Sequence, residues 1–137
     1  NVLKGFDAYE FLDYMAGIDQ IEFTYIGRHR GTFLNTRCID PCSGHELANR
    51  LKGHDVYISG SRFDPGPNHI LEAIACGLPT YVHKDGGGAV EFAGISHTFG
   101  NLSELENLIL SNSFSKNGYQ PITWNESIQA YLREIER

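Results

Sequence analysis

Two acidic side chains stand where a Gly- and Pro-rich loop enters a short helical pattern, and both could bind hydroxyl groups. Asp64 lies in the loop, and Glu72 lies on the helix expected over residues 67–76. The free N–H groups and the dipole at the start of such a helix attract phosphate, and here the backbone of Asn68 and His69 would supply them. A carboxylate one turn further along is placed to accept hydrogen bonds from ribose hydroxyls. This pattern is typical of a nucleotide site.

Each acid also has a plainer interpretation. Asp64 stands in an Asp-Pro-Gly sequence, where an aspartate is a common turn residue. Glu72 has apolar neighbours in the expected helix, so we expect its carboxylate to be partly buried and paired, with Arg62 or Lys84 as the partner. Residue types alone leave both interpretations open.

The elements expected around these acids alternate between helices and strands. Apolar spacing and glycine stops predict helices over 6–16, 44–52, 67–76 and 89–92 and around 102–109 and 128–135, and β-forming runs predict strands over 21–26, 36–39, 55–59 and 80–83. Capping boxes are expected at Ser43 and Thr123. This order predicts an α/β fold: a Rossmann-like parallel sheet with helices on both faces.

Ligands of parallel sheets bind beyond the carboxyl ends of the strands. In this chain the loops at those ends follow Ile26, Ile39, Ser59 and His83, and they are rich in Gly, Pro, Arg, His and Asp. A run of glycines at 86–88 allows positive φ angles and the close approach of another group. The predicted binding edge therefore coincides with the unusual residues.

Composition and charge limit the classes of function. The 137 residues, 41% hydrophobic and 20% charged, predict one globular domain over 1–137. A net charge of −6 argues against nucleic acid as a partner. The sequence has no apolar stretch of membrane-spanning length and no signal-peptide pattern, so we expect a cytoplasmic protein. Because the chain opens at Asn1 and enters a helical pattern at once, we interpret it as a part of a larger, two-domain protein.

Cysteine spacing favours reduced thiols over a metal site. Cys38, Cys42 and Cys76 make an odd count and lack the paired spacing of zinc ligands. A metal bound with the help of His45 is the alternative. We expect no metal.

The segment from Asp64 to Pro79, DPGPNHILEAIACGLP, resembles the acid-x7-acid motif and its continuation in glycosyltransferase family 4, whose members have the GT-B fold. Further segments match in the family's order, namely Lys4-Gly5, Ile26-Gly27, Asp55 to Ile58 and Gly87 to Glu91. The resemblance covers about residues 2–110.

This resemblance implies the C-terminal, donor-binding half of a retaining glycosyltransferase of the hexosyltransferase type, with a nucleotide-diphospho-sugar as substrate and no cofactor. It implies that the acceptor binds an N-terminal domain of the same polypeptide and that this half is inactive by itself. Any contact with a membrane would be made through that N-terminal domain. Glu72 would bind the ribose and Asp64 the donor sugar, and these are the candidate catalytic residues. The other donor-binding residues would be Lys4 at the diphosphate, Asn68 and His69 at the phosphates, Gly66 and Pro67 in the loop before them, and Gly27, Arg28 and Ile39 beside the base.

Three residues depart from the family pattern. Asp64 stands where glutamate is usual, Gly66 where an aromatic residue is common, and Pro67 where glycine is customary. A shorter acid reaches less far, which leaves open a second interpretation: a noncatalytic GT-B-like module that binds a nucleotide or a partner protein. An NAD domain is disfavoured because no G-x-G-x-x-G follows a strand.

Overall fold

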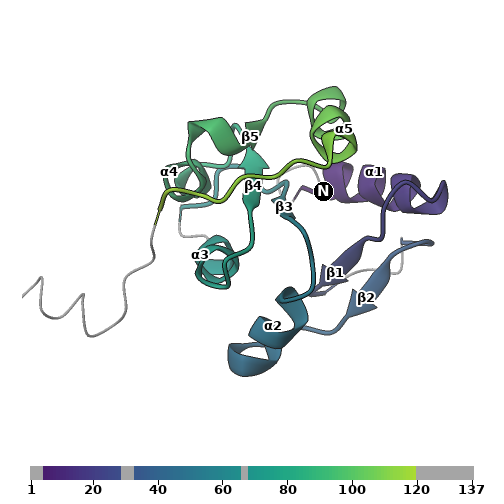
Figure 1. Ribbon diagram of the computed structural model, residues 1–137, viewed down its shortest axis with the longest axis horizontal. Helices are drawn as coiled ribbons and strands as arrows, with labels where there is room; N and C mark the ends of the chain where they lie inside the picture. Colours follow the sequence, from purple (N-terminus) through teal and green to yellow (C-terminus); the bar gives the residue numbers. More distant parts are fainter. Residues whose placement is uncertain (1–4, 29–32, 66–67, 120–137) are drawn as a thin grey trace, which may run out of the picture.

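The computed structural model describes residues 5–28, 33–65 and 68–119 and has an α/β fold (Figure 1). Its helices are α1 (Phe6–Gly17), α2 (Gly44–Leu51), α3 (Asn68–Ala75), α4 (Gly88–Ala93) and α5 (Leu102–Ser111), with a 3-10 turn η2 (Ile95–His97). Its strands are β1 (Thr24–Ile26), β2 (Arg37–Ile39), β3 (Tyr57–Ser59), β4 (Thr80–His83) and β5 (Thr98–Phe99). The predicted alternation of helices and strands is confirmed. The helix around 128–135 and the capping box at Thr123 lie outside the described residues.

The strands pair in parallel, as predicted, but they form two small sheets instead of one. β1 pairs with β2, and β3, β4 and β5 pair in that order. The strand expected over 21–26 is reduced to Thr24–Ile26, the three residues that face Arg37–Ile39 in the ladder. Strand length depends on the partner as much as on the strand's own pattern, so the sequence overestimated it.

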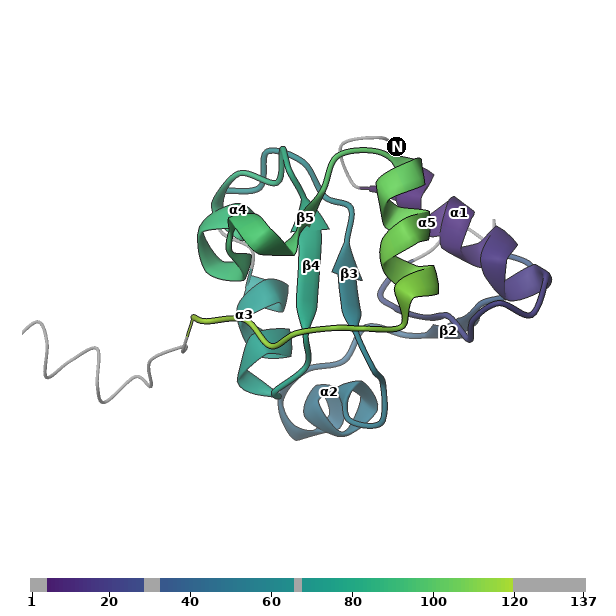
Figure 2. The same ribbon diagram turned by 45° about the horizontal axis from the view of Figure 1, so that its top comes forward.

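Helices cover both faces of the three-stranded sheet (Figure 2). On one face, Phe99 packs in a buried cluster with residues of α1 and α5, namely Ala8, Leu12, Met15, Leu105 and Ile109. On the other face, Val82 packs with residues of α3 and α4, namely Ile70, Ile74, Ala89 and Ala93. Because neighbouring residues of a strand point to opposite faces, β4 directs Val82 towards α3 and α4 and the next residue, His83, towards α1 and α5.

The two described N-caps with polar side chains, Ser43 and Asn101, behave differently. Asn101 caps α5, and its Oδ1 accepts a hydrogen bond from the N–H of Glu104 at 2.8 Å. The capping box expected at Ser43 is wrong, because the Ser43 side chain makes no hydrogen bond at the start of α2. The next residue, Gly44, has a φ of 62°, so the backbone at the start of α2 does not follow the path of a capping box.

A segment beyond α5 closes the domain by running back past β3 and β4 towards α3 (Figure 2). The buried Asn117 accepts a hydrogen bond from Thr80 N at 2.9 Å and donates to the carbonyl oxygens of Thr80 and Ala93 at 2.8 Å each. One side chain thereby ties the start of β4 to the end of α4.

Candidate functional site

The start of α1 lies against the carboxyl end of β3. Gly5 has a φ of 83°, and a Cβ atom on it would stand 2.4 Å from the backbone carbonyl carbon of Gly60, so only glycine fits there. The Gly60 N–H donates to the Tyr9 hydroxyl at 3.1 Å. The Tyr9 ring lies 5.6 Å from the ring of Tyr25 in β1. The carboxyl ends of β1 and β3 therefore meet beside the start of α1.

The loop that carries Asp64 is fastened to the glycine run after β4. Asp64 forms a parallel bridge with Gly87, its N–H donates to Gly86 O at 3.3 Å, and its carbonyl accepts from Gly88 N at 2.9 Å. A Cβ on Gly87, which has a φ of 67°, would stand 2.9 Å from the Asp64 carbonyl oxygen. The close approach that the glycines were expected to allow is thus made by the protein's own backbone.

Phe63 stands next to Asp64 in an unusual conformation. Its φ is 56°, a region that bulky residues seldom occupy, and its side chain is 70% exposed. The Phe63 N–H donates to Asp85 O at 2.7 Å, which holds the backbone in place. Such strain concentrates at functional sites and directs attention to this loop. No sequence pattern distinguishes Phe63 from an ordinary loop residue.

The first turn of α3 faces the Asp64 loop. His69 lies with its Nε2 3.4 Å from the Ser59 hydroxyl and its ring 6.2 Å from that of Tyr57. Burial lowers the pKa of His69, and the negative charge of Asp64 opposes part of that shift. Asp64 and His69 are therefore close in space, as the site hypothesis requires, and the His69 ring is neutral at pH 7.

The exposure of Glu72 contradicts one prediction. The sequence predicts a partly buried, paired carboxylate, but Glu72 is exposed, and its carboxylate makes no hydrogen bond or ion pair with the described residues. The buried face of α3 consists of Ile70, Ala73 and Ile74. At about 100° per residue, Glu72 points to the side away from Ile70. Its carboxylate faces solvent and is free to bind a ligand.

The remaining predicted residues fall into two groups. Gly27 and Ile39 join the ends of β1 and β2, where the Gly27 N–H donates to Ile39 O at 3.0 Å. The exposed Arg28 follows, and its carbonyl accepts from the Tyr25 hydroxyl at 3.1 Å. Asn68 is exposed at the start of α3. Three predicted residues lie outside the described part of the chain: Lys4, Gly66 and Pro67.

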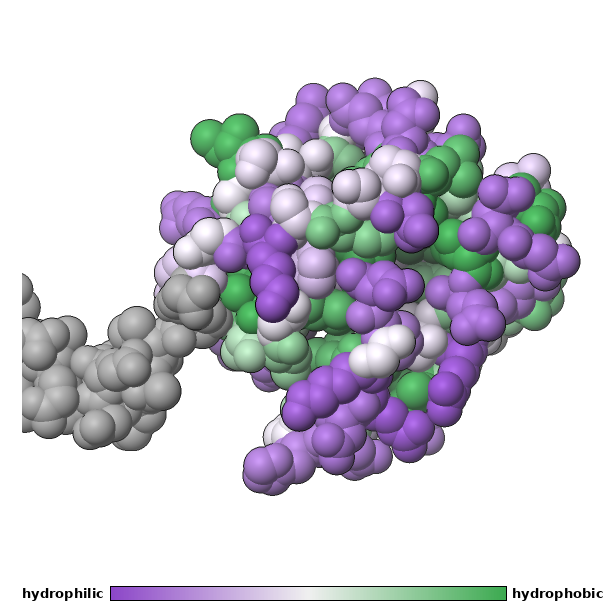
Figure 3. Space-filling view, in the orientation of Figure 1, coloured by the Kyte–Doolittle hydropathy of each residue, from purple (hydrophilic) through white to green (hydrophobic). Residues whose placement is uncertain are grey.

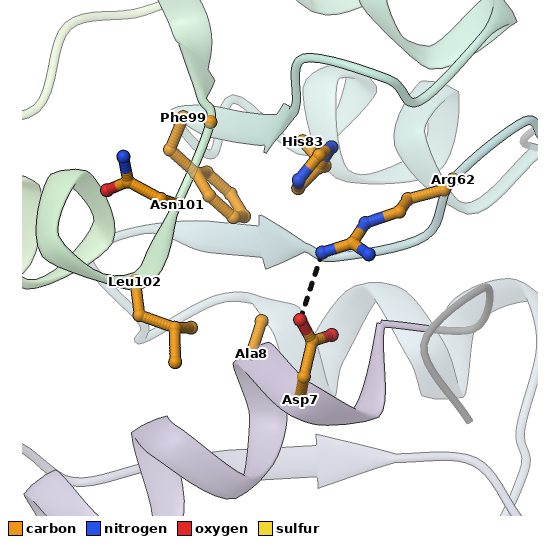
Figure 4. Close-up of a pocket in the computed structure, with 8 residues that line it drawn as sticks. Asp7, Ala8, Arg62, His83, Phe99, Asn101 and Leu102 are labelled. Atoms are coloured by element: carbon orange, nitrogen blue, oxygen red, sulfur yellow. Dashed lines mark hydrogen bonds and ion pairs between the residues drawn. The ribbon is translucent and has the colours of Figure 1, made fainter.

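A cavity that sequence reasoning missed opens between α1, the ends of β4 and β5, and the start of α5 (Figure 4). It has a volume of about 210 Å³. Its polar wall is formed by Asp7, Arg62 and His83, and an ion pair of 2.9 Å joins Asp7 Oδ2 to Arg62 Nη2. Arg62, offered above as a partner for Glu72, is therefore paired with Asp7. Their positions were the available signal, because Arg62 follows the carboxyl end of β3 and His83 is the last residue of β4.

His83 lines this cavity with one ring nitrogen already hydrogen-bonded. Its Nδ1 accepts a hydrogen bond from Asp85 N at 3.0 Å, so the proton of the neutral ring is on Nε2. Burial lowers the pKa of His83, and the neighbouring Arg62 charge lowers it further, although the carboxylates of Asp85 and Asp7 act in the opposite direction. The Asp85 carboxylate, 3.9 Å from Nδ1, consequently faces a neutral ring at pH 7.

The described residues hold no candidate metal site. Cys38, Cys42 and Cys76 are free thiols. No group of three His, Cys, Asp or Glu side chains in residues 5–28, 33–65 and 68–119 is placed to bind an ion. His45 is exposed on α2, over which hydrophilic residues gather (Figure 3).

The fold and site define an α/β protein whose parallel strands carry polar loops at their carboxyl ends. No family model matches the chain, and neither a curated protein nor a solved structure matches it. No helix in the described part of the chain is long and apolar enough to cross a bilayer.

Proposed function

We propose that this chain is the donor-binding half of a retaining glycosyltransferase and that it binds a nucleotide-diphospho-sugar. In this proposal the sugar passes to an acceptor held by an N-terminal domain of the same polypeptide, and the isolated half transfers nothing. The observation that carries the proposal is the convergence of the Asp64 loop, the first turn of α3 and the glycine run at the carboxyl ends of β3 and β4.

Electrostatics at the start of α3 favour an anion there. The first-turn N–H groups have no partner within a helix, and they carry the positive end of the dipole. Asn68 is exposed at this end. A diphosphate bound here would have the exposed Glu72 one turn further along the helix, where its carboxylate can accept two ribose hydroxyls. The exposure of Glu72 supports this role better than a structural one.

The Asp64 carboxylate is proposed to bind hydroxyls of the transferred sugar. Its main chain is held by the bridge to Gly87 and the hydrogen bonds to Gly86 and Gly88, so the side chain starts from a fixed backbone. A fixed starting point matters because positioning supplies much of the rate enhancement in group transfer. Arg28 and Gly27, at the end of β1, are proposed to contact the base.

Calorimetric titration tests the proposal. The purified domain is titrated with UDP, GDP and ADP, first without metal and then with Mg²⁺. We expect one nucleotide to bind selectively, and Glu72→Ala to weaken it about tenfold to a hundredfold, because a hydrogen bond to a charged group is lost. The matched control is Glu106→Ala, an exposed acid on α5, which should bind as the wild type does. Absence of binding by all three nucleotides would overturn the proposal.

One observation favours a second candidate, a noncatalytic module that binds a nucleotide or a partner protein. The glycine run is occupied by the backbone of Asp64 and Pro65, so it offers less free N–H surface to a phosphate than an open glycine loop would. On this alternative, Glu72→Ala leaves the affinity for nucleotide and partner unchanged. The same titration therefore separates the two candidates.

A further inference from the structure

The cavity beside α1 combines an apolar wall with a polar one. Ala8, Phe99 and Leu102 form the apolar side, and Asp7, Arg62 and His83 face them (Figure 4). Ala8 and Phe99 are buried, and Leu102 is 40% exposed at the rim. This division matches a molecule that has one carbon-rich face and several hydrogen-bonding groups.

The polar wall contains side-chain atoms that lack hydrogen-bond partners. Asp7 Oδ1 and Arg62 Nε are buried and have no hydrogen-bond partner, although the other ends of both groups form the 2.9 Å ion pair. His83 is 4% exposed and also lines the cavity. Buried polar atoms are nearly always bonded, so these two unbonded atoms leave the hydrogen bonding of the wall incomplete.

Charge selects the kind of ligand. The Asp7 carboxylate and the Arg62 guanidinium cancel each other, and a neutral His83 adds no charge. An anion would be attracted by Arg62 but repelled by Asp7, and a cation would meet the reverse. A hydroxyl group can donate to a carboxylate and accept from an N–H at the same time. Uncharged hydroxylated molecules therefore fit this wall best.

We propose that the cavity is a subsite for a small uncharged polyol such as a single sugar ring. A volume of about 210 Å³ suits one ring, since pockets for drug-sized ligands begin at about 300 Å³. The carbon face of the ring would lie on Phe99 and Leu102, and its hydroxyls would bond to Asp7 and His83. The inference rests on the cavity alone and does not depend on the nucleotide site.

NMR titration of the isotope-labelled domain tests this subsite. The probes are D-glucose, D-mannose, N-acetyl-D-glucosamine and inorganic phosphate. We expect at least one sugar to shift the signals of Asp7, Phe99, Leu102 and the His83 ring, with a dissociation constant on the order of 1–10 mM. Phosphate should leave these signals unchanged.

Two variants with matched controls locate the binding. Leu102→Trp places a large ring at the rim and should abolish the sugar-induced shifts, whereas Leu110→Trp, an exposed leucine further along the same helix, should bind as the wild type does. Asp7→Asn should weaken binding about tenfold, since a charged acceptor is replaced by a neutral one. Its control is Glu10→Gln, an exposed acid on α1. The amide spectrum of each variant reports whether it is folded.

The proposal is overturned if no sugar shifts the cavity signals, if phosphate alone does, or if folded Leu102→Trp binds sugar as tightly as the wild type. These results are separate from the nucleotide titration. Sugar binding without nucleotide binding would retain the subsite and reject the donor-half proposal, and the reverse pattern would do the opposite.

Discussion

Two buried histidines, His83 and His97, have very different hydrogen bonding. His97 Nε2 donates to the Ser115 carbonyl oxygen at 2.8 Å and lies 3.2 Å from the Ser115 hydroxyl, and Nδ1 lies 3.1 Å from the Ser96 hydroxyl. The His83 ring accepts a hydrogen bond from Asp85 N at Nδ1 and lines a cavity. Both side chains are buried to a similar degree.

This difference separates a region of the molecule that contributes to stability from a region that is available for binding. The region around His97 and Asn117 uses its polar atoms to tie the segment after α5 to β4 and α4. The region around His83 leaves polar atoms of Asp7 and Arg62 unbonded at the carboxyl ends of the strands. A fully bonded network contributes to folding, whereas an incomplete one is available to a ligand. Three predictions test this division.

The largest effect is expected at Asn117, in the fully bonded region. Asn117→Ala removes three hydrogen bonds and leaves the backbone groups of the fully buried Thr80 without partners. We expect the free energy of unfolding to fall by about 3 kcal/mol, measured by urea denaturation. Asn107→Ala, at an exposed position on α5, is the control and should change stability by less than about 0.5 kcal/mol. Equal losses in the two variants would contradict the structural role of Asn117.

A smaller effect should separate the two histidines directly. His97→Phe removes the bonds to Ser96 and Ser115 and should cost about 2 kcal/mol, although the new ring can still pack on Tyr81, 4.7 Å away. His83→Phe loses one bond, its ring can pack on Phe99, and the exposed Asp85 can bond to water, so we expect a cost of about 1 kcal/mol or less.

Urea denaturation of both variants under one set of conditions measures the difference. If His83→Phe proved the more destabilising of the two, His83 would be a structural residue and the division drawn above would fail.

The smallest effect is a pH dependence of stability. His69 and His83 have pKa values lowered from 6.5 by burial, so below pH 6.5 the unfolded chain takes up protons that the folded protein does not. Stability is therefore complete above pH 6.5 and falls as the pH drops through the lowered values. Asp13, whose carboxylate accepts from Thr36 and Asn35, has a pKa held below 3.8 by these bonds against the opposing effect of burial, and adds a further loss at lower pH.

Unfolding free energies measured across this range, with NMR titration of the His83 ring, test the prediction. His83→Phe should reduce the slope below pH 6.5. An unchanged slope would show that His83 does not contribute.

Local elements were predictable because their signals are local. Apolar spacing located α1 and α5 within a residue or two, and Gly77, with a φ of 77°, ends α3 as expected. Parallel pairing followed from the alternation of helices and strands. β5 and η2 were missed because two-residue and three-residue elements carry too little pattern to recognise.

The candidate site was predictable only in part. Because both residues follow the end of β3, the sequence correctly predicted that Asp64 lies close to His69. The exposure of Glu72 was misjudged because apolar neighbours in sequence do not show which face of a helix is buried. Arg62 could not be assigned a partner, since Asp7 is distant in sequence and the contact arises only when α1 packs on the sheet.

The sequence by itself determined the alternating elements, the loops at the strand ends and the residue types available there, because these depend on short-range periodicity and backbone preference. Tertiary structure alone decided that the strands divide into two sheets, that the glycine run packs against the Asp64 backbone, and that Asp7, Arg62 and His83 surround one cavity. Those outcomes depend on contacts between segments far apart in the chain, which local patterns do not encode.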